Sequence, residues 1–279
     1  MSLRAVTRKE FQDSIHSFSL LGLTLLFTLF AGWLTALQFI PRGFRESAVN
    51  PTTLALLNSM RQPALFFVPL VGLALGYNSI IGERETGTIK VILGLPNTRN
   101  EVVLGKFVGR GAVLLTAILV SYMAVGLTAL ALYDSFSVWI FATYTVLTVL
   151  YGLVYIAIGI ALSASVDSQI RALSAAGFFY GLFLLVWDVF VAGIATATVG
   201  YTLPQTGGPP WLQALFMLNP STAFAYATRA VIPEYREISI LFDPTVFYLQ
   251  DWVGFVVLAL WITVPLALGY QRFNTDDLR

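Results

Sequence analysis

Long runs of apolar residues restrict the fold of this sequence more than any other feature. Six of them reach about 20 residues, the length that a helix needs to cross the roughly 30 Å hydrocarbon core of a bilayer. Backbone polar groups need internal partners in hydrocarbon, and these runs lack barrel-like alternation, so they predict helices. The predicted spans are residues 18–40, 63–81, 107–132, 138–163, 172–195 and 252–270.

The scarcity of charge supports the same assignment. Asp, Glu, Lys and Arg form 11% of the 279 residues, whereas soluble domains carry about 25%. A surface with so little charge would not stay in water. The predicted fold class is therefore an all-α polytopic membrane protein with six transmembrane helices. Because no loop is long and polar enough to fold separately, residues 1–279 are expected to form one transmembrane domain.

Composition also excludes several classes of function. The net charge of +1 provides no basic field for nucleic acid. The chain has no Cys and a single His, His16, which excludes thiolate, iron–sulfur and multi-histidine metal sites. The intramembrane His or paired Asp motifs of membrane-embedded enzymes are also missing. We therefore expect no nucleic-acid partner, no metal site and no catalytic activity in this chain.

The distribution of Lys and Arg predicts the orientation of the spans. With six spans both termini share one side, and that side carries eleven of the 16 basic residues, against five on the other. Because cytoplasmic loops carry the excess of Lys and Arg, we expect a cell-membrane protein with both termini in the cytoplasm. The eleven are Arg4, Arg8, Lys9, Arg84, Lys90, Arg99, Lys106, Arg110, Arg171, Arg272 and Arg279, and the five are Arg42, Arg45, Arg61, Arg229 and Arg236.

The segment 82–96 is the most informative connection. Charge is concentrated at residues 83–85, where the second span leaves the membrane. Ile89, Ile92 and Leu93 then recur at helical spacing, which predicts a short amphipathic helix that proline 96 ends. Taken alone, the segment is either a docking element or a solvated connector between two spans.

Two further signals predict where helices begin. Thr98 and Glu101 form the Thr-x-x-Glu pattern of a capping box at the start of the third span's helix. Short helices are expected at 211–218 and 221–232 in the outer segment before the last span, the second capped by Asn219. An amphipathic helix is expected at 5–17, although Arg4 intrudes on its apolar face.

Three glycine pairs have the small-xxx-small spacing that lets helices approach closely. We expect most of them to pack within the chain, with one at a dimer face as the alternative. The pairs are Gly72 with Gly76, Gly105 with Gly109, and Gly177 with Gly181.

These features together resemble a known family. The run Glu-Arg-Glu-Thr-Gly-Thr at 83–88, followed by Leu-Gly-Leu-Pro at 93–96, Arg99 and Leu-Gly-Lys at 104–106, is similar to the membrane subunit of a type-2 ATP-binding-cassette (ABC) exporter. The likeness is greatest to the permease branch that includes the nitrous-oxide-reductase maturation transporter. The Leu-Asn-Pro sequence at 218–220 and the six-span layout agree with it.

The resemblance implies a site and partners. The segment after the second span would be a coupling helix that docks on a separate ATPase subunit, and the permease would act as a homodimer or heterodimer in the lipid bilayer. ATP with Mg²⁺ would bind the partner, and this chain would bind no cofactor, because Thr88 stands where a P-loop needs Lys. The coupling residues so implied are Glu83, Glu85, Thr86, Gly87, Thr88, Ile89, Ile92 and Leu93, with Asp167 and Arg171 as a second contact.

Asp188 is the one acidic residue deep within a predicted span. A charge at the bilayer centre costs about 2.5–3.5 kcal/mol on insertion scales, so Asp188 should face a cavity, outer-leaflet water or a polar partner. It is a candidate pathway residue. The main alternative function is a secondary transporter that uses an ion gradient, with Asp188 as the coupling carboxylate, but no internal repeat of that class is visible.

Overall fold

The computed structural model is a bundle of helices. It describes residues 3–15, 22, 25, 28–29, 32, 52–89, 98–133, 135–200, 209–239, 241 and 246–275, and these contain no β-strand beyond an isolated bridge between Thr52 and Ser135. The α-helices are α1 (Leu3–Ile15), α3 (Thr53–Gly76), α4 (Ile81–Glu85), α6 (Arg99–Leu132), α7 (Val138–Ser165), α8 (Gln169–Gly181), α9 (Trp187–Val199), α10 (Pro210–Met217), α11 (Pro220–Val231) and α12 (Val253–Thr275).

Five helical segments of the described residues are long and apolar enough to cross a membrane: Thr53–Glu85, Arg99–Leu132, Val138–Ser165, Gln169–Thr198 and Val253–Thr275. They confirm the helical class and cover the last five predicted spans, except that Trp252, predicted to begin the last one, lies just before its helix. Of the first predicted span, 18–40, the structure describes residues 22, 25, 28, 29 and 32 only. The prediction of a sixth span therefore lies outside the described residues. The Thr28 hydroxyl lies 2.8 Å from that of Ser121 on α6.

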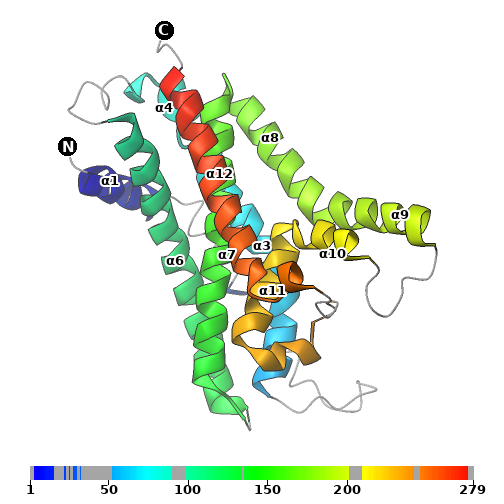
Figure 1. Cartoon of the computed structure of the whole chain (residues 1–279). Helices are drawn as coiled ribbons and strands as arrows, with labels where there is room; N and C mark the ends of the chain where they lie inside the picture. Colours follow the sequence, from blue (N-terminus) through cyan, green and yellow to red (C-terminus); the bar gives the residue numbers. More distant parts are fainter. Residues whose placement is uncertain are drawn as a thin grey trace.

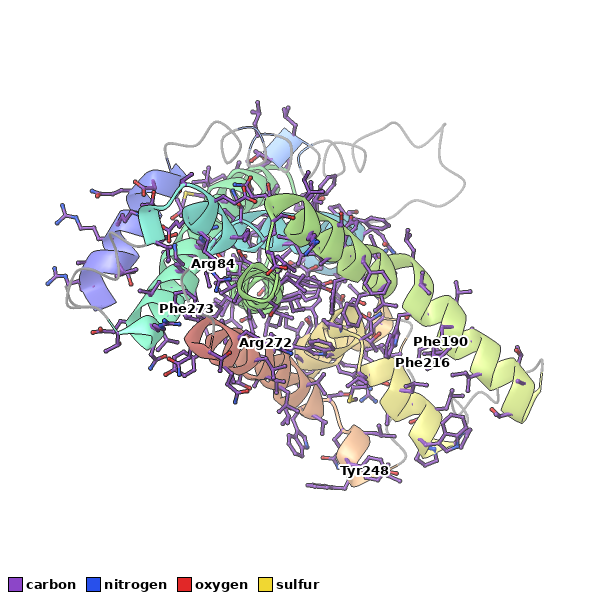
Figure 2. The ribbon with its side chains drawn as sticks, turned by 90° about the horizontal axis from the view of Figure 1, so that it is seen from above. Arg84, Phe190, Phe216, Tyr248, Arg272 and Phe273 are labelled. Carbon is purple, nitrogen blue, oxygen red and sulfur yellow. The ribbon has the colours of Figure 1, made fainter. Side chains whose placement is uncertain are left out.

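Helix α7 lies at the centre of the bundle, with α3, α6 and α12 beside it (Figures 1 and 2). Glycines permit a close approach of α3 to α7. A Cβ atom on Gly76 would lie 2.7 Å from Cα of Gly159, and one on Gly72 would lie 2.8 Å from Cβ of Tyr155. The pair Gly105 and Gly109 packs in the same way against α1, whereas a Cβ on Gly177 or Gly181 meets no atom within 4 Å. Two of the three glycine pairs therefore pack within the chain.

The second helix begins earlier than hydropathy indicates. The sequence places a connection over 41–62, but α3 starts at Thr53, ten residues before the apolar run. The Thr52 side chain caps the helix by accepting a hydrogen bond from the Ala55 amide at 3.3 Å. The interpretation of residues 53–62 as a loop is therefore wrong, because hydropathy marks the part of a helix that suits lipid and caps mark where the helix begins.

The fifth membrane-length segment changes its hydrogen bonding midway. Between α8 and α9 the residues Leu182–Val186 form a π-helix, and the chain changes direction there (Figure 1). A π-helical turn leaves the backbone less regular and recurs at functional sites. Here the carbonyl of Phe183 accepts a hydrogen bond from the Asn219 side chain at 2.9 Å.

The short helices before the last span are confirmed within a residue at each end. Asn219 caps α11 by accepting from the Ser221 amide at 3.0 Å, and Pro220 is its first residue, as the sequence predicts. At the other end of α11, Arg229 is 3% exposed and its guanidinium lies 2.5 Å from the Asp251 carboxylate. This ion pair fixes α11 to the chain just before α12.

Candidate functional site

The segment after α3 is short and sharply bounded. A turn over 77–80 leads into α4, and the amide of Gly87 donates to the carbonyl of Arg84 at 3.1 Å as the helix ends. Gly87 has φ = +73°, the left-handed conformation that favours glycine at a helix C-terminus. The sequence predicts one helix through this region, but the turn at Gly87 separates α4 from the helical residues 88 and 89.

A network of charged side chains joins this segment to α1 and α6. Glu83 Oε2 lies 2.8 Å from Lys106 Nζ, and Glu83 Oε1 lies 3.0 Å from Lys9 Nζ. Lys106 Nζ also lies 2.7 Å from Glu10 Oε1, and Arg110 Nε lies 3.1 Å from Glu10 Oε2. The Lys106 side chain is 0% exposed, so its charge is neutralised almost entirely by the two carboxylates.

The surroundings of Glu10 determine its ionisation. Burial by itself raises the pKa of this carboxyl, but Lys106 and Arg110 outweigh burial and hold the pKa below its usual value. Glu10 is therefore ionised at neutral pH. Ionised Glu10 therefore stabilises the folded chain at any pH above the usual pKa of a glutamate. This stabilisation is lost as the pH falls through the lower pKa that Glu10 has in the folded chain.

The same segment also contacts α7, α8 and α12. The Ser163 hydroxyl of α7 accepts hydrogen bonds from the amides of Ile80 and Ile81 at 2.9 and 3.0 Å. Glu85 Oε1 accepts from the amide of Gln169, the first residue of α8, at 2.8 Å. The guanidinium carbon of Arg84 lies 5.5 Å from the centroid of the Phe273 ring near the end of α12 (Figure 2). One short segment is thus tied to five different helices.

The sequence-predicted coupling residues divide into inward and outward groups. Glu83 has a side chain only 14% exposed, and Ile89 is 2% exposed and packs in the main core cluster. Glu85, Thr86 and Thr88 are exposed. Ile92 and Leu93 lie outside the described residues.

The second predicted contact lies beside the first. The Asp167 and Arg171 side chains are 85% and 67% exposed and pair with each other at 2.8 Å. Ile170, between them, is 78% exposed. Because Glu85 accepts a hydrogen bond from the first residue of α8, the two predicted contacts are adjacent and form one surface, which we call the exposed end face. It comprises Glu85, Thr86, Thr88, Asp167, Ile170 and Arg171.

Asp188 lies away from this face, in the first turn of α9. Its Oδ1 atom lies 3.5 Å from Nδ2 of Asn219, and its side chain lines a cavity of about 210 Å³. Asn219, with 0% exposure, thus contacts both the π-helix and the one acidic residue of this span.

Sequence reasoning missed several residues that hold this site together. Glu10 and Ser163 belong to no motif, and Lys106 entered only as part of the Leu-Gly-Lys run at 104–106, without its role as an ion-pair partner. Each of the three acts through a partner far away in the chain. One signal was available: Lys106 and Arg110 lie four residues apart, each directly after a glycine. In a helix this pattern puts two cations next to a glycine face against which another helix can pack closely.

Comparison with known proteins identifies the family. Residues 4–278 match the model of the ABC-2 family transporter proteins. The chain is 32% identical over 277 residues to a protein of Stutzerimonas stutzeri described as "Probable ABC transporter permease protein NosY", with 96% of each chain covered. It is 30% identical over 285 residues to the protein of the same description from Pseudomonas aeruginosa, again with 96% of each covered. These matches confirm the resemblance seen in the sequence: the chain belongs to the ABC-2 family of transporter proteins.

Proposed function

We propose that this chain is the non-catalytic permease subunit of an ABC exporter in the cytoplasmic membrane. It works as one of two permease copies with separate ATPase subunits that bind ATP and Mg²⁺. Family membership supports the transporter class, and the relatives are described as probable ABC transporter permeases. The secondary-transporter alternative gains no support from the comparisons.

The observation that carries the proposal is the attachment of residues 80–85 to five helices. Such a segment transmits a displacement at one end of the bundle to all the helices it contacts. The exposed end face is the docking surface for the ATPase in this proposal, and the excess of Lys and Arg predicts that this face lies on the cytoplasmic side. In this proposal the inward-facing side chains of Glu83 and Ile89 fix the docking segment to the rest of the bundle and do not touch the partner.

A route from this face toward the pathway follows the contacts of α8. Movement of Glu85 moves the first residue of α8 through the hydrogen bond to Gln169. Helix α8 ends in the π-helix, whose Phe183 carbonyl is bonded to Asn219 beside Asp188. In this proposal the π-helix is the hinge, and Asp188 borders the translocation pathway.

Exchanging the charges of Asp167 and Arg171 tests the docking surface. The double variant Asp167→Arg, Arg171→Asp keeps an exposed pair four residues apart, and such pairs contribute about 0–1 kcal/mol, so folding should be unchanged. The partner, however, meets reversed charges. We expect at least about tenfold weaker binding of the cognate ATPase, measured by co-purification and titration, with ATP hydrolysis no longer coupled to transport.

The control reverses exposed charges near the start of α3, away from the exposed end face. Glu234 and Glu237 are both exposed, and Glu234→Lys, Glu237→Lys should bind the ATPase like the unmodified chain. Normal binding by the Asp167 and Arg171 variant would reject this docking surface. Failure of the unmodified chain to bind any ATPase would reject the proposed function.

A further inference from the structure

A cavity lined by both polar and apolar side chains lies between α3, α9, α11 and the segment after α11. It has a volume of about 210 Å³, enough for a small polar molecule or several waters. Arg61 of α3 and Asp188 of α9 both line it, together with Thr222 in the first turn of α11 and Tyr235 of the 3₁₀-helix Pro233–Glu237. The docking surface of the ATPase is not part of it.

One wall of the cavity offers unused donors. Arg61 Nη1 donates to the carbonyl of Ile238 at 3.0 Å, but its buried Nε has no partner among the described residues. Tyr235 is 0% exposed, and its hydroxyl likewise has no partner there. Burial raises the pKa of Tyr235 to about 12, so the hydroxyl keeps its proton and can donate. A buried donor without an acceptor costs about 1–3 kcal/mol, and its presence in a folded protein calls for an explanation such as a ligand.

Another wall carries an uncompensated acid. Within the described residues the only polar contact of the Asp188 carboxylate is the long one to Asn219, at 3.5 Å. No basic side chain there lies within ion-pair distance of it, and Arg61 does not reach across the cavity to it. Ionisable residues within a membrane segment mark functional sites, because unpaired they are costly.

Neither a simple anion nor a simple cation satisfies both walls. An anion that reaches Arg61 enters a cavity that also holds a carboxylate, and a cation beside Asp188 shares the space with a guanidinium. We propose that the cavity binds a small zwitterion, whose oxyanion accepts hydrogen bonds from Arg61 and Tyr235 and whose ammonium group pairs with Asp188. An arginine fork suits carboxylate and phosphate alike, and a lipid headgroup and a free metabolite share this chemistry.

Binding is measured on the permease alone, so the result does not depend on ATPase docking. The chain is placed in nanodiscs of phosphatidylglycerol, and thermal stability and intrinsic fluorescence are followed during titration. The zwitterions are β-alanine and glycerophosphoethanolamine, which differ in the separation of their charges. Dimethyl phosphate and ethanolamine serve as probes with one charge only. We expect saturable binding of at least one zwitterion and at least tenfold weaker binding of each single-charge probe.

A parallel set of nanodiscs contains phosphatidylethanolamine and distinguishes the two sources of ligand. Stabilisation in this lipid without binding of the free zwitterions identifies a lipid headgroup as the ligand. Binding of a free zwitterion without an effect of the lipid identifies a soluble ligand. The absence of both effects overturns the proposal, and so does equal binding of dimethyl phosphate or ethanolamine.

Two variants test which wall of the cavity binds which charge of the zwitterion. Asp188→Asn should weaken binding of the zwitterion at least about tenfold while strengthening that of dimethyl phosphate, because repulsion of the anion is removed. Arg61→Gln should weaken binding of the zwitterion to a similar extent and strengthen binding of ethanolamine. Arg236→Gln, at an exposed arginine outside the cavity, should bind like the unmodified chain. If Asp188→Asn leaves the preference among the probes unchanged, the assignment is wrong.

Discussion

Lys106→Met is expected to lower the melting temperature of the purified chain by about 10 °C. Lys106 is fully buried between the carboxylates of Glu10 and Glu83, at 2.7 and 2.8 Å. Methionine keeps the length of the side chain but leaves two largely buried acids facing each other. Removing one partner of a buried ion pair costs about 3–5 kcal/mol, and 1 kcal/mol shifts the melting temperature by roughly 2–4 °C in a chain of this size class.

The matched control is Lys9→Met in the same network. Lys9 contacts Glu83 at 3.0 Å, but its side chain is 43% exposed, so its loss should cost about 1 kcal/mol or less. Limited proteolysis provides a second readout, because α1 is held to α6 partly by these pairs. Acidification below the usual glutamate pKa of 4.5 should release α1 in the unmodified chain and less sharply in Glu10→Gln. Equal effects of both lysine variants would contradict the network.

Gly76→Val is expected to separate α3 from α7 and destabilise the bundle by about 1–3 kcal/mol or more. Even a Cβ atom on Gly76 would lie 2.7 Å from Cα of Gly159 and 2.8 Å from the Ile156 carbonyl oxygen. Both neighbours are backbone atoms, so no rotamer change can relieve the contact. The two helices would have to move apart where they pack against each other.

Gly177→Val makes the same substitution where the described structure has room. A Cβ on Gly177 meets nothing within 4 Å, and valine suits a helix slightly better than glycine. Thermal unfolding in detergent should therefore show a loss for Gly76→Val and little or no loss for Gly177→Val. Equal losses in both variants would contradict the packing described for α3 and α7.

Local signals in the sequence predicted much of this architecture. Hydropathy located the last five spans, because their apolar composition is a property of the segment itself. The capping box of Thr98 and Glu101 and the Asn219 cap with Pro220 were predictable for the same reason: donor and acceptor lie within three residues of each other. Element boundaries failed where hydropathy alone was used, as at the start of α3.

Contacts between distant residues could not be predicted in this way. Glu10 and Lys106 are 96 positions apart, and neither periodicity nor composition specifies their pairing. The π-helix at Leu182–Val186 is a run of large apolar residues with no signature of its own. Ile89 fitted an amphipathic docking helix, but the left-handed turn at Gly87 redirects the chain and buries its side chain. The inferred roles of the coupling residues remain predictions.

Cross-linking from single cysteines tests the proposed docking of the ATPase most directly. The chain has no Cys, so Thr88→Cys, Ile170→Cys and Trp139→Cys each introduce one unique thiol at an exposed position. Thr88 and Ile170 belong to the exposed end face, whereas Trp139 lies in the first turn of α7, at the opposite end of the bundle (Figure 1). After co-purification with the cognate ATPase, a short thiol-to-amine cross-linker should join the ATPase to the first two positions and leave Trp139→Cys unlinked. Cross-links from Trp139→Cys, with none from Thr88→Cys or Ile170→Cys, would contradict the account.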